Sequence, residues 1–116
     1  MTDKVKTGNQ GEEMAAEFLQ QKGYEILACN YRYKHSEIDL IVRKDNLIVF
    51  VEVKTRSSSE FGEPEAFVDS KKAVKIIEGA DQYVYENNWN GNIRFDIVSV
   101  KLGSKPEVVH FEDAFY

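Results

Sequence analysis

The stretch EIDLIVRKDNLIVFVEVK, from Glu37 to Lys54, contains two apolar runs separated by the short polar segment Lys44–Asn46. Each run has the length and composition of a β-strand, and the polar segment has the composition of a tight turn. We therefore predict a β-hairpin over these residues. The second run, LIVFV, is apolar on both of its alternating faces, which is typical of a central strand covered on both sides.

Two segments outside the hairpin have helical patterns. Apolar residues recur at helical spacing over residues 11–22, where Thr7 is a candidate cap and Gly23 is a natural stop. A second apolar stripe at the same spacing starts near Asp69 or Ser70, either of which could cap the helix. These patterns predict one helix before the hairpin and one after it.

Three more segments have the composition of strands. They are residues 24–33, residues 93–102 and residues 108–111, and the last of them is expected at a sheet edge. The predicted order is therefore helix, three strands, helix, two strands. This order indicates an α/β domain with a mixed sheet.

The composition is that of a single folded domain over residues 1–116. With 42% hydrophobic residues and no Pro-rich linker, the chain can bury a core and is not expected to be disordered. No apolar run approaches the roughly 20 residues of a membrane span, and the polar N-terminal segment does not resemble a secretory signal. The single cysteine, Cys29, is expected to be a small core residue. These features predict a cytoplasmic protein with no membrane partner.

Charged residues stand at one end of the predicted hairpin, directly beside its apolar runs. Side chains alternate along a strand, so Glu52 and Lys54 share one face, and Glu37 and Asp39 share a face of the neighbouring strand. Strand pairing would bring these groups to the same end of the sheet, although a register shift of one residue would turn one set away. Carboxylates buried together raise one another's pKa, a conflict that a divalent cation resolves.

Oxygen ligands of this kind suit Mg²⁺ or Mn²⁺. Asp39 and Glu52 are the candidate ligands, and Lys54 could orient a metal-bound water or neutralise charge on an attacked phosphate. The alternative is that these charges form the solvated rim of a sheet, with Glu52 and Lys54 as an ordinary surface pair. The spacing alone leaves both interpretations open.

The same residues carry a resemblance to known proteins. EIDLIV followed by VFVEVKTR resembles the signature of the PD-(D/E)XK, or restriction-endonuclease-like, superfamily. Nearly the whole chain is similar to the YraN-like family of predicted endonucleases, which are related in fold to archaeal Holliday junction resolvases. This broader similarity runs through GNQGEEMAAEFL, SEIDLI, VFVEVKTR, GEPEAFVDSKK and RFDIVSV. It implies a restriction-endonuclease-like α/β fold, with an αβββαβ core whose mixed central sheet is flanked by helices.

The resemblance also implies an activity, that of a metal-dependent DNA endonuclease acting on branched DNA with Mg²⁺ or Mn²⁺. It makes Asp39 and Glu52 metal ligands and Lys54 the catalytic lysine. Glu12 matches a first-helix glutamate that reaches the metal site in related nucleases, so it is a further catalytic and metal-binding candidate. The alternative for Glu12 is a first-turn acid that is favourable to the helix dipole. At Ser36 the chain departs from the family, which tends to have Gly there.

A phosphodiesterase also needs a basic path for its polyanionic substrate. The candidate nucleic-acid contacts are Arg56, Ser57, Lys71, Lys72 and Lys75. Glu37 and Arg94 are candidate supporting residues. The lysines could instead form a solvated helix face, and His35 and His110, which lack metal-like spacing, are expected to be structural or surface residues.

A second function class remains open, a non-catalytic nucleic-acid-binding module that retains the nuclease fold. The 15 Lys+Arg and 20 Asp+Glu give a net charge of −5, which argues against a protein that coats nucleic acid by bulk charge but permits a local basic groove. The late segment HFEDAFY, residues 110–116, is a candidate edge for a homodimer.

Overall fold

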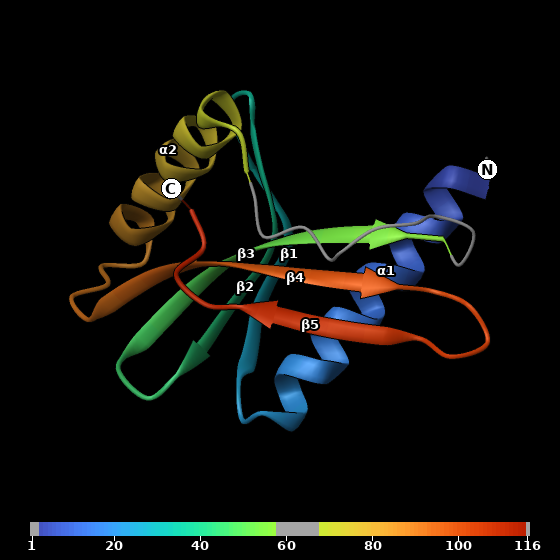
Figure 1. Ribbon diagram of the computed structural model, residues 1–116. Helices are drawn as coiled ribbons and strands as arrows, with labels where there is room; N and C mark the ends of the chain where they lie inside the picture. The colour runs from blue at the N-terminus through green and yellow to red at the C-terminus, as the bar shows by residue number, and fades with distance from the viewer. Residues whose placement is uncertain (1–2, 58–67, 116) are drawn as a thin grey trace.

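The computed structural model describes residues 3–57 and 68–115, which form two helices and one five-stranded mixed sheet (Figure 1). This architecture confirms the α/β fold class and the predicted order of elements. Within the described ranges, no helix is long and apolar enough to cross a membrane. The elements are α1 (Asp3–Gln21), β1 (Glu25–Tyr33), β2 (Ser36–Lys44), β3 (Leu47–Arg56), α2 (Ser70–Glu86), β4 (Asn92–Lys101) and β5 (Glu107–Phe111).

Strand β3 is the centre of the sheet, whose strand order is β1-β2-β3-β4-β5. It pairs antiparallel with β2 and parallel with β4, while β1 and β5 form the two antiparallel edges. Lys44 pairs with Leu47, so Asp45 and Asn46 make the turn of the predicted hairpin. Asp45 has a left-handed backbone (φ 54°), which aspartate tolerates in tight hairpin turns. The hairpin is confirmed.

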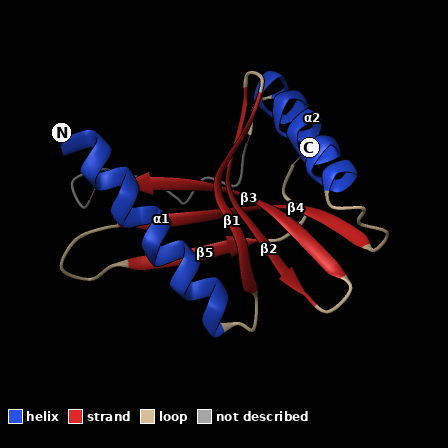
Figure 2. Ribbon diagram, turned by 180° about the vertical axis from the view of Figure 1, so that it is seen from behind, coloured by secondary structure: helices blue, strands red, loops and turns tan. Residues whose placement is uncertain are grey.

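The two helices cover opposite faces of the sheet, as the front and back views show (Figures 1 and 2). Val49 and Val51 of β3 lie in the core cluster that includes residues of α1, whereas Ile48 and Phe50 lie in the cluster that includes residues of α2. Because side chains alternate along a strand, a run that is apolar on both faces supplies both clusters. The prediction of a doubly covered central strand is confirmed.

The structure confirms two of the predicted helix ends and corrects two other local predictions. Gly23 ends α1 with φ 96°, and Asp69 caps α2 by accepting a hydrogen bond from the Lys72 N–H at 2.9 Å. Thr7 was wrongly assigned as a cap, because α1 begins at Asp3 and Thr7 lies inside it. The core assignment of Cys29 was also wrong, since β1 is an edge strand whose residues are all exposed or partly exposed.

A buried charged network joins β4, β5 and the end of α1. Asp96 is fully buried and accepts two hydrogen bonds from Arg94, at 2.8 and 2.7 Å, and one from the Asp113 N–H at 2.9 Å. His110 Nε2 lies 2.7 Å from the same carboxylate, and the Lys22 ammonium lies 2.7 Å from His110 Nδ1. An ammonium can only donate, so Nδ1 accepts and the Nε2–H donates to Asp96.

This network sets the protonation of Asp96. Burial alone would raise the pKa of this carboxyl group, but hydrogen bonds from Arg94, His110 and the Asp113 N–H outweigh it and hold the pKa below its usual value of 3.8. Asp96 is therefore an ionised and fully paired structural carboxylate.

Replacing Asp96→Asn is expected to lower the free energy of unfolding near neutral pH by about 3 kcal/mol, because the change leaves a charged guanidinium without its buried partner. Since the pKa of Asp96 is lowered by folding, its contribution is present above the unfolded pKa and is lost as the pH falls below about 4. Urea denaturation across this range should show the difference from the unmodified protein shrinking in acid. The exposed control Asp81→Asn should change the free energy by less than about 0.5 kcal/mol. A difference for Asp96→Asn that stays constant with pH would contradict the assignment.

Candidate active site

Two carboxylates meet where the pairing of β2 with β3 ends. The last paired residues are Leu40 and Val51. Beyond them the side chain of Asp39 takes the place of a backbone acceptor, since its Oδ2 accepts a hydrogen bond from the Val53 N–H at 2.8 Å. Glu52, which is only 6% exposed, lies within hydrogen-bonding reach of the Asp39 carboxyl. The structure thus brings two of the sequence-predicted site residues together.

Irregular backbone in two neighbouring strands lies at the level of this pair. Ile38 and Ile41 both lie in the α2 core cluster, whereas Leu40 lies in the α1 cluster, so the alternation of β2 is interrupted around Asp39. Opposite Asp39 on β1, Asn30 has a left-handed backbone with φ 53°. Such irregularities redirect side chains and are common beside functional sites. Sequence periodicity alone missed this feature, although asparagine is a residue type that accepts positive φ.

The pKa of Asp39 is strongly perturbed. Burial and the neighbouring charge of Glu52 raise it from 3.8 to about 8, with a smaller contribution from Glu12, while the hydrogen bond from the Val53 N–H acts in the opposite direction. The charge of Glu52 thus opposes the ionisation of Asp39, because two like charges lie close together. Asp39 therefore stays largely protonated at neutral pH, and a carboxyl group with so strongly perturbed a pKa is typical of catalytic and metal-binding sites.

Glu12 approaches the pair from α1. Burial raises its pKa, the charges of Glu37 and Glu52 raise it further, and a side-chain hydrogen bond with Asn30 opposes them. Since α1 begins at Asp3, Glu12 lies in the middle of the helix, and the interpretation as a first-turn acid was wrong. Its electrostatic coupling to Glu52 puts it at the edge of the site.

Gly11 permits this approach of α1 to β3. A Cβ atom at Gly11 would overlap the side chain of Thr55, one residue beyond Lys54. The absence of a side chain at Gly11 therefore lets the helix pack directly against the end of β3, which brings Glu12 close enough to couple electrostatically with Glu52. Gly11 and Glu12 both lie in the GNQGEEMAAEFL motif.

A lysine from α2 already contacts the pair. The Nζ atom of Lys72 lies 2.8 Å from Glu52 Oε1. Burial acts to lower the pKa of Lys72, but the hydrogen bond and charge of Glu52, together with the charge of Asp39, outweigh it and raise that pKa. From the sequence, Lys72 was predicted only as a nucleic-acid contact. The sequence shows only that Lys72 lies three residues after the N-cap Asp69. Its contact with Glu52 depends on how α2 packs against the sheet, which no local pattern shows.

The other predicted site residues lie at the end of β3, on α2 and elsewhere in the sheet. Lys54 shares the face of Glu52 on β3, and Arg56 and Ser57 follow at the end of that strand, all partly buried. Lys71 and Lys75 are exposed on α2. Glu37 is exposed and lies 3.6 Å from Arg32. Arg94 does not join the site, because it is committed to the Asp96 network on the α1 face.

The donor set suits a hard divalent cation. Asp39 and Glu52 offer carboxylate oxygens, and Mg²⁺ is commonly held by one or two carboxylates while keeping several waters. Within residues 3–57 and 68–115, no three acidic, histidine or cysteine side chains are already arranged to hold a metal ion. Glu12 therefore stands near the pair without completing a preformed three-residue cluster with it.

Replacing Asp39→Asn is expected to stabilise the protein in alkali. Folding raises the pKa of Asp39 from 3.8 to about 8, so its favourable contribution is complete below 3.8 and is lost as the pH rises to about 8. The variant should exceed the unmodified protein in unfolding free energy by about 2 kcal/mol above pH 8, with no advantage near pH 4. Urea denaturation at both pH values measures this, with the exposed Glu37→Gln as control. A loss of stability in alkali would refute the assignment.

Comparison with known proteins identifies the family. The model of the uncharacterised protein family UPF0102 matches residues 11–100. A UPF0102 protein of Flavobacterium psychrophilum is 44% identical over 117 residues, covering 100% of this chain and 98% of that protein. Another from Alkaliphilus oremlandii is 45% identical over 116 residues, covering 95% and 97%. Among solved structures, Pyrococcus furiosus SfsA in complex with Ca²⁺ is similar, with a TM-score of 0.44 and 12% identity over 98% of this chain and 65% of that chain. The YraN-like membership is thus confirmed, and the chain belongs to the UPF0102 family.

Proposed function

We propose that this protein is a metal-dependent DNA endonuclease that hydrolyses phosphodiester bonds with Mg²⁺ or Mn²⁺. The observation that carries the proposal is the meeting of Asp39 and Glu52 at the end of the β2–β3 pairing. The surrounding EIDLIV and VFVEVKTR segments support it, because they resemble the PD-(D/E)XK signature. A divalent cation would relieve the repulsion between the two carboxylates.

Each residue of the site has a role in this proposal. Asp39, oriented by the Val53 N–H, and Glu52 would hold the ion, with Glu12 as a third acidic group at the edge. Such an ion lowers the pKa of a bound water and neutralises charge on a phosphate. Lys54, on the face of Glu52, would stabilise the charge that develops on the attacked phosphate.

The basic residues around the pair would bind the DNA backbone. Arg56 and Ser57 continue along β3, and Lys71, Lys72 and Lys75 stand on the first turns of α2. Cationic side chains that neutralise phosphates supply most of the affinity in such interfaces. Branched DNA is the substrate class suggested by the resemblance to Holliday junction resolvases, and the β5 edge is the proposed surface for pairing with a second copy.

One observation favours a second function, that of a non-catalytic nucleic-acid-binding module. Lys72 already places an ammonium group 2.8 Å from Glu52. A protein without turnover could use this lysine as a permanent counter-ion for the pair and would need no metal. The two functions differ in whether the carboxylates bind a cation.

Calorimetric titration with Mn²⁺ distinguishes the two functions. The unmodified protein should bind Mn²⁺ in the presence of a short DNA duplex that completes the coordination sphere. Asp39→Asn and Glu52→Gln should each weaken this binding by about tenfold or more, because each removes a proposed ligand. Glu25→Gln, which changes an exposed acid at the start of β1, should bind as the unmodified protein does. Absence of Mn²⁺ binding even with the duplex would favour the non-catalytic module.

Cleavage of labelled linear, flapped and four-way DNA with Mn²⁺ tests the reaction itself. Lys54→Met should lower the cleavage rate by about 100-fold while leaving Mn²⁺ affinity close to normal, since the lysine acts on the phosphate and not on the ion. Glu52→Gln should abolish cleavage. Equal cleavage by Glu52→Gln and the unmodified protein would exclude the assigned site.

A further inference from the structure

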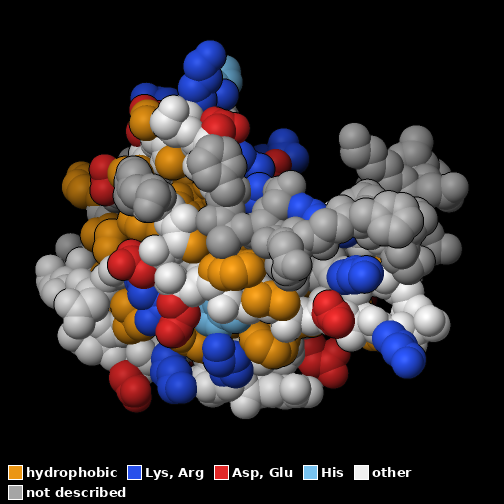
Figure 3. All heavy atoms as spheres, viewed as in Figure 1, with side chains coloured by type: hydrophobic (Ala, Val, Ile, Leu, Met, Phe, Trp, Pro, Cys, Tyr) orange, Lys and Arg blue, Asp and Glu red, His pale blue; other side chains and the backbone are white. Residues whose placement is uncertain are grey.

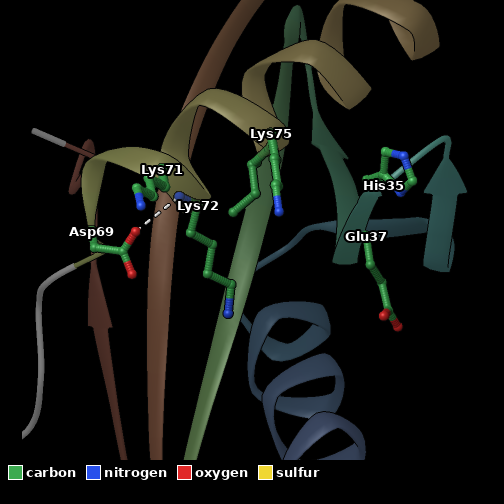
Figure 4. Close-up of a pocket in the computed structure, with 7 residues that line it drawn as sticks. His35, Glu37, Asp69, Lys71, Lys72 and Lys75 are labelled. Atoms are coloured by element: carbon green, nitrogen blue, oxygen red, sulfur yellow. Dashed lines mark hydrogen bonds between the residues drawn. The ribbon is translucent and has the colours of Figure 1, made fainter.

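A hollow of about 420 Å³ lies between the first turns of α2 and the β1–β2 turn. Lys72, whose ammonium contacts Glu52, is one of its lining residues, so the hollow opens directly beside the carboxylate pair. Figure 4 shows Lys72 and Lys75 extending from α2 on one side, with His35 and Glu37 on the other. A second hollow of about 500 Å³ shares His35, Lys71 and Lys75 with the first. Together they form a path from the pair to the β1–β2 turn.

The path is basic although the chain as a whole carries a net charge of −5. The basic residues of its lining are Lys34, His35, Lys71, Lys72 and Lys75. The acids of the lining are Asp69, which caps α2, Glu37, which lies 3.6 Å from Arg32, and Glu78 in the second hollow, so the basic residues outnumber them. Figure 3 shows lysine or arginine side chains and a histidine gathered over the end of the molecule formed by the β1–β2 turn. This local charge is complementary to a polyanion.

The two walls of the path are held in fixed relation. Ser36, the first residue of β2, is buried against Gly79 of α2, where an added Cβ would lie 2.5 Å from the Ser36 Oγ. His35 is the adjacent residue, and Lys34 has a left-handed backbone with φ 55° that defines the turn. The walls of the hollow are therefore set by close packing.

The shape and lining of the path fit one strand better than a duplex. Hollows of this volume accept a ligand the size of about one or two nucleotides. Val74, which is 56% exposed, lines the second hollow and gives it apolar surface beside the lysines of α2, whereas Ile76 in the lining of the first hollow is buried. Single-strand sites combine cationic grooves with surfaces that accept bases, and histidine rings serve as stacking groups.

We propose that this path binds one single strand of DNA leading away from the carboxylate pair, with Lys71 and Lys75 of α2 contacting its phosphates and His35 stacking on a base. The proposal rests on the proposed function and deepens it, because it names an unpaired strand as the part of the substrate that the protein holds. It also gives the β1–β2 turn a role in substrate binding.

Fluorescence anisotropy of a labelled single-stranded 12-mer, with EDTA present to prevent cleavage, tests the proposal. The full chain should bind this strand more tightly than a 12-base-pair duplex. The double variant Lys71→Ala/Lys75→Ala should bind at least about tenfold more weakly, and the slope of log affinity against log salt should fall by about 1.4, since two phosphate contacts are lost. His35→Ala should weaken binding by about threefold to tenfold with the salt slope unchanged.

A matched control removes the same charge elsewhere. Lys44 and Lys105 are exposed at the end of β2 and beyond β4, away from the path, and the double variant Lys44→Ala/Lys105→Ala should bind like the unmodified protein. An equal loss in this control, tighter binding of the duplex, or no binding of either DNA would overturn the proposal. Because EDTA removes the metal, failure of the nuclease assignment does not alter this result. Conversely, if the protein cleaves DNA with Mn²⁺ but the Lys71→Ala/Lys75→Ala and His35→Ala variants bind the single strand normally, only the proposed single-strand path is refuted.

Discussion

The close approach of two acids, the partly buried Asp39 and the buried Glu52, is the constraint on which the site depends. It arises because the pairing of β2 with β3 ends at Leu40 and Val51, so the Val53 N–H has no partner on β2 and donates its hydrogen bond to Asp39. Glu52 then needs a positive charge, which Lys72 supplies from α2. The packing of α2 and the electrostatics of the site are therefore coupled, since the helix that covers the sheet also carries the counter-ion.

The pKa values of two acids in the sheet, Asp96 and Asp39, are shifted in opposite directions. On the α1 face, Asp96 is paired with Arg94 and His110, and its pKa is lowered. At the end of the β2–β3 pairing, Asp39 has one backbone donor and an acidic neighbour, and its pKa rises to about 8. Burial acts in the same direction on both groups, so the partners decide the outcome. A satisfied acid stabilises the fold, whereas an unsatisfied acid remains available for chemistry.

Local patterns predicted most of the fold, for identifiable reasons. The apolar alternation of LIVFV predicted a strand covered on both faces, and the Asp69 cap predicted the start of α2. The two errors, the Thr7 cap and the core assignment of Cys29, occurred where the local pattern does not determine the structure. The start of α1 lies before its apolar stripe, so the stripe could not mark it. Cys29 has the chemistry of a core residue, but its strand became an edge.

The sequence by itself determined the acids of the site and the sheet that carries them, because strand periodicity and the spacing of Glu52 and Lys54 are properties of a few consecutive residues. Only the tertiary structure decided their partners. Lys72 meets Glu52 through the packing of α2, and His35 joins the lysines of α2 because Ser36 packs against Gly79. These contacts join separate elements, and their geometry depends on helix docking and strand irregularities that no local spacing encodes.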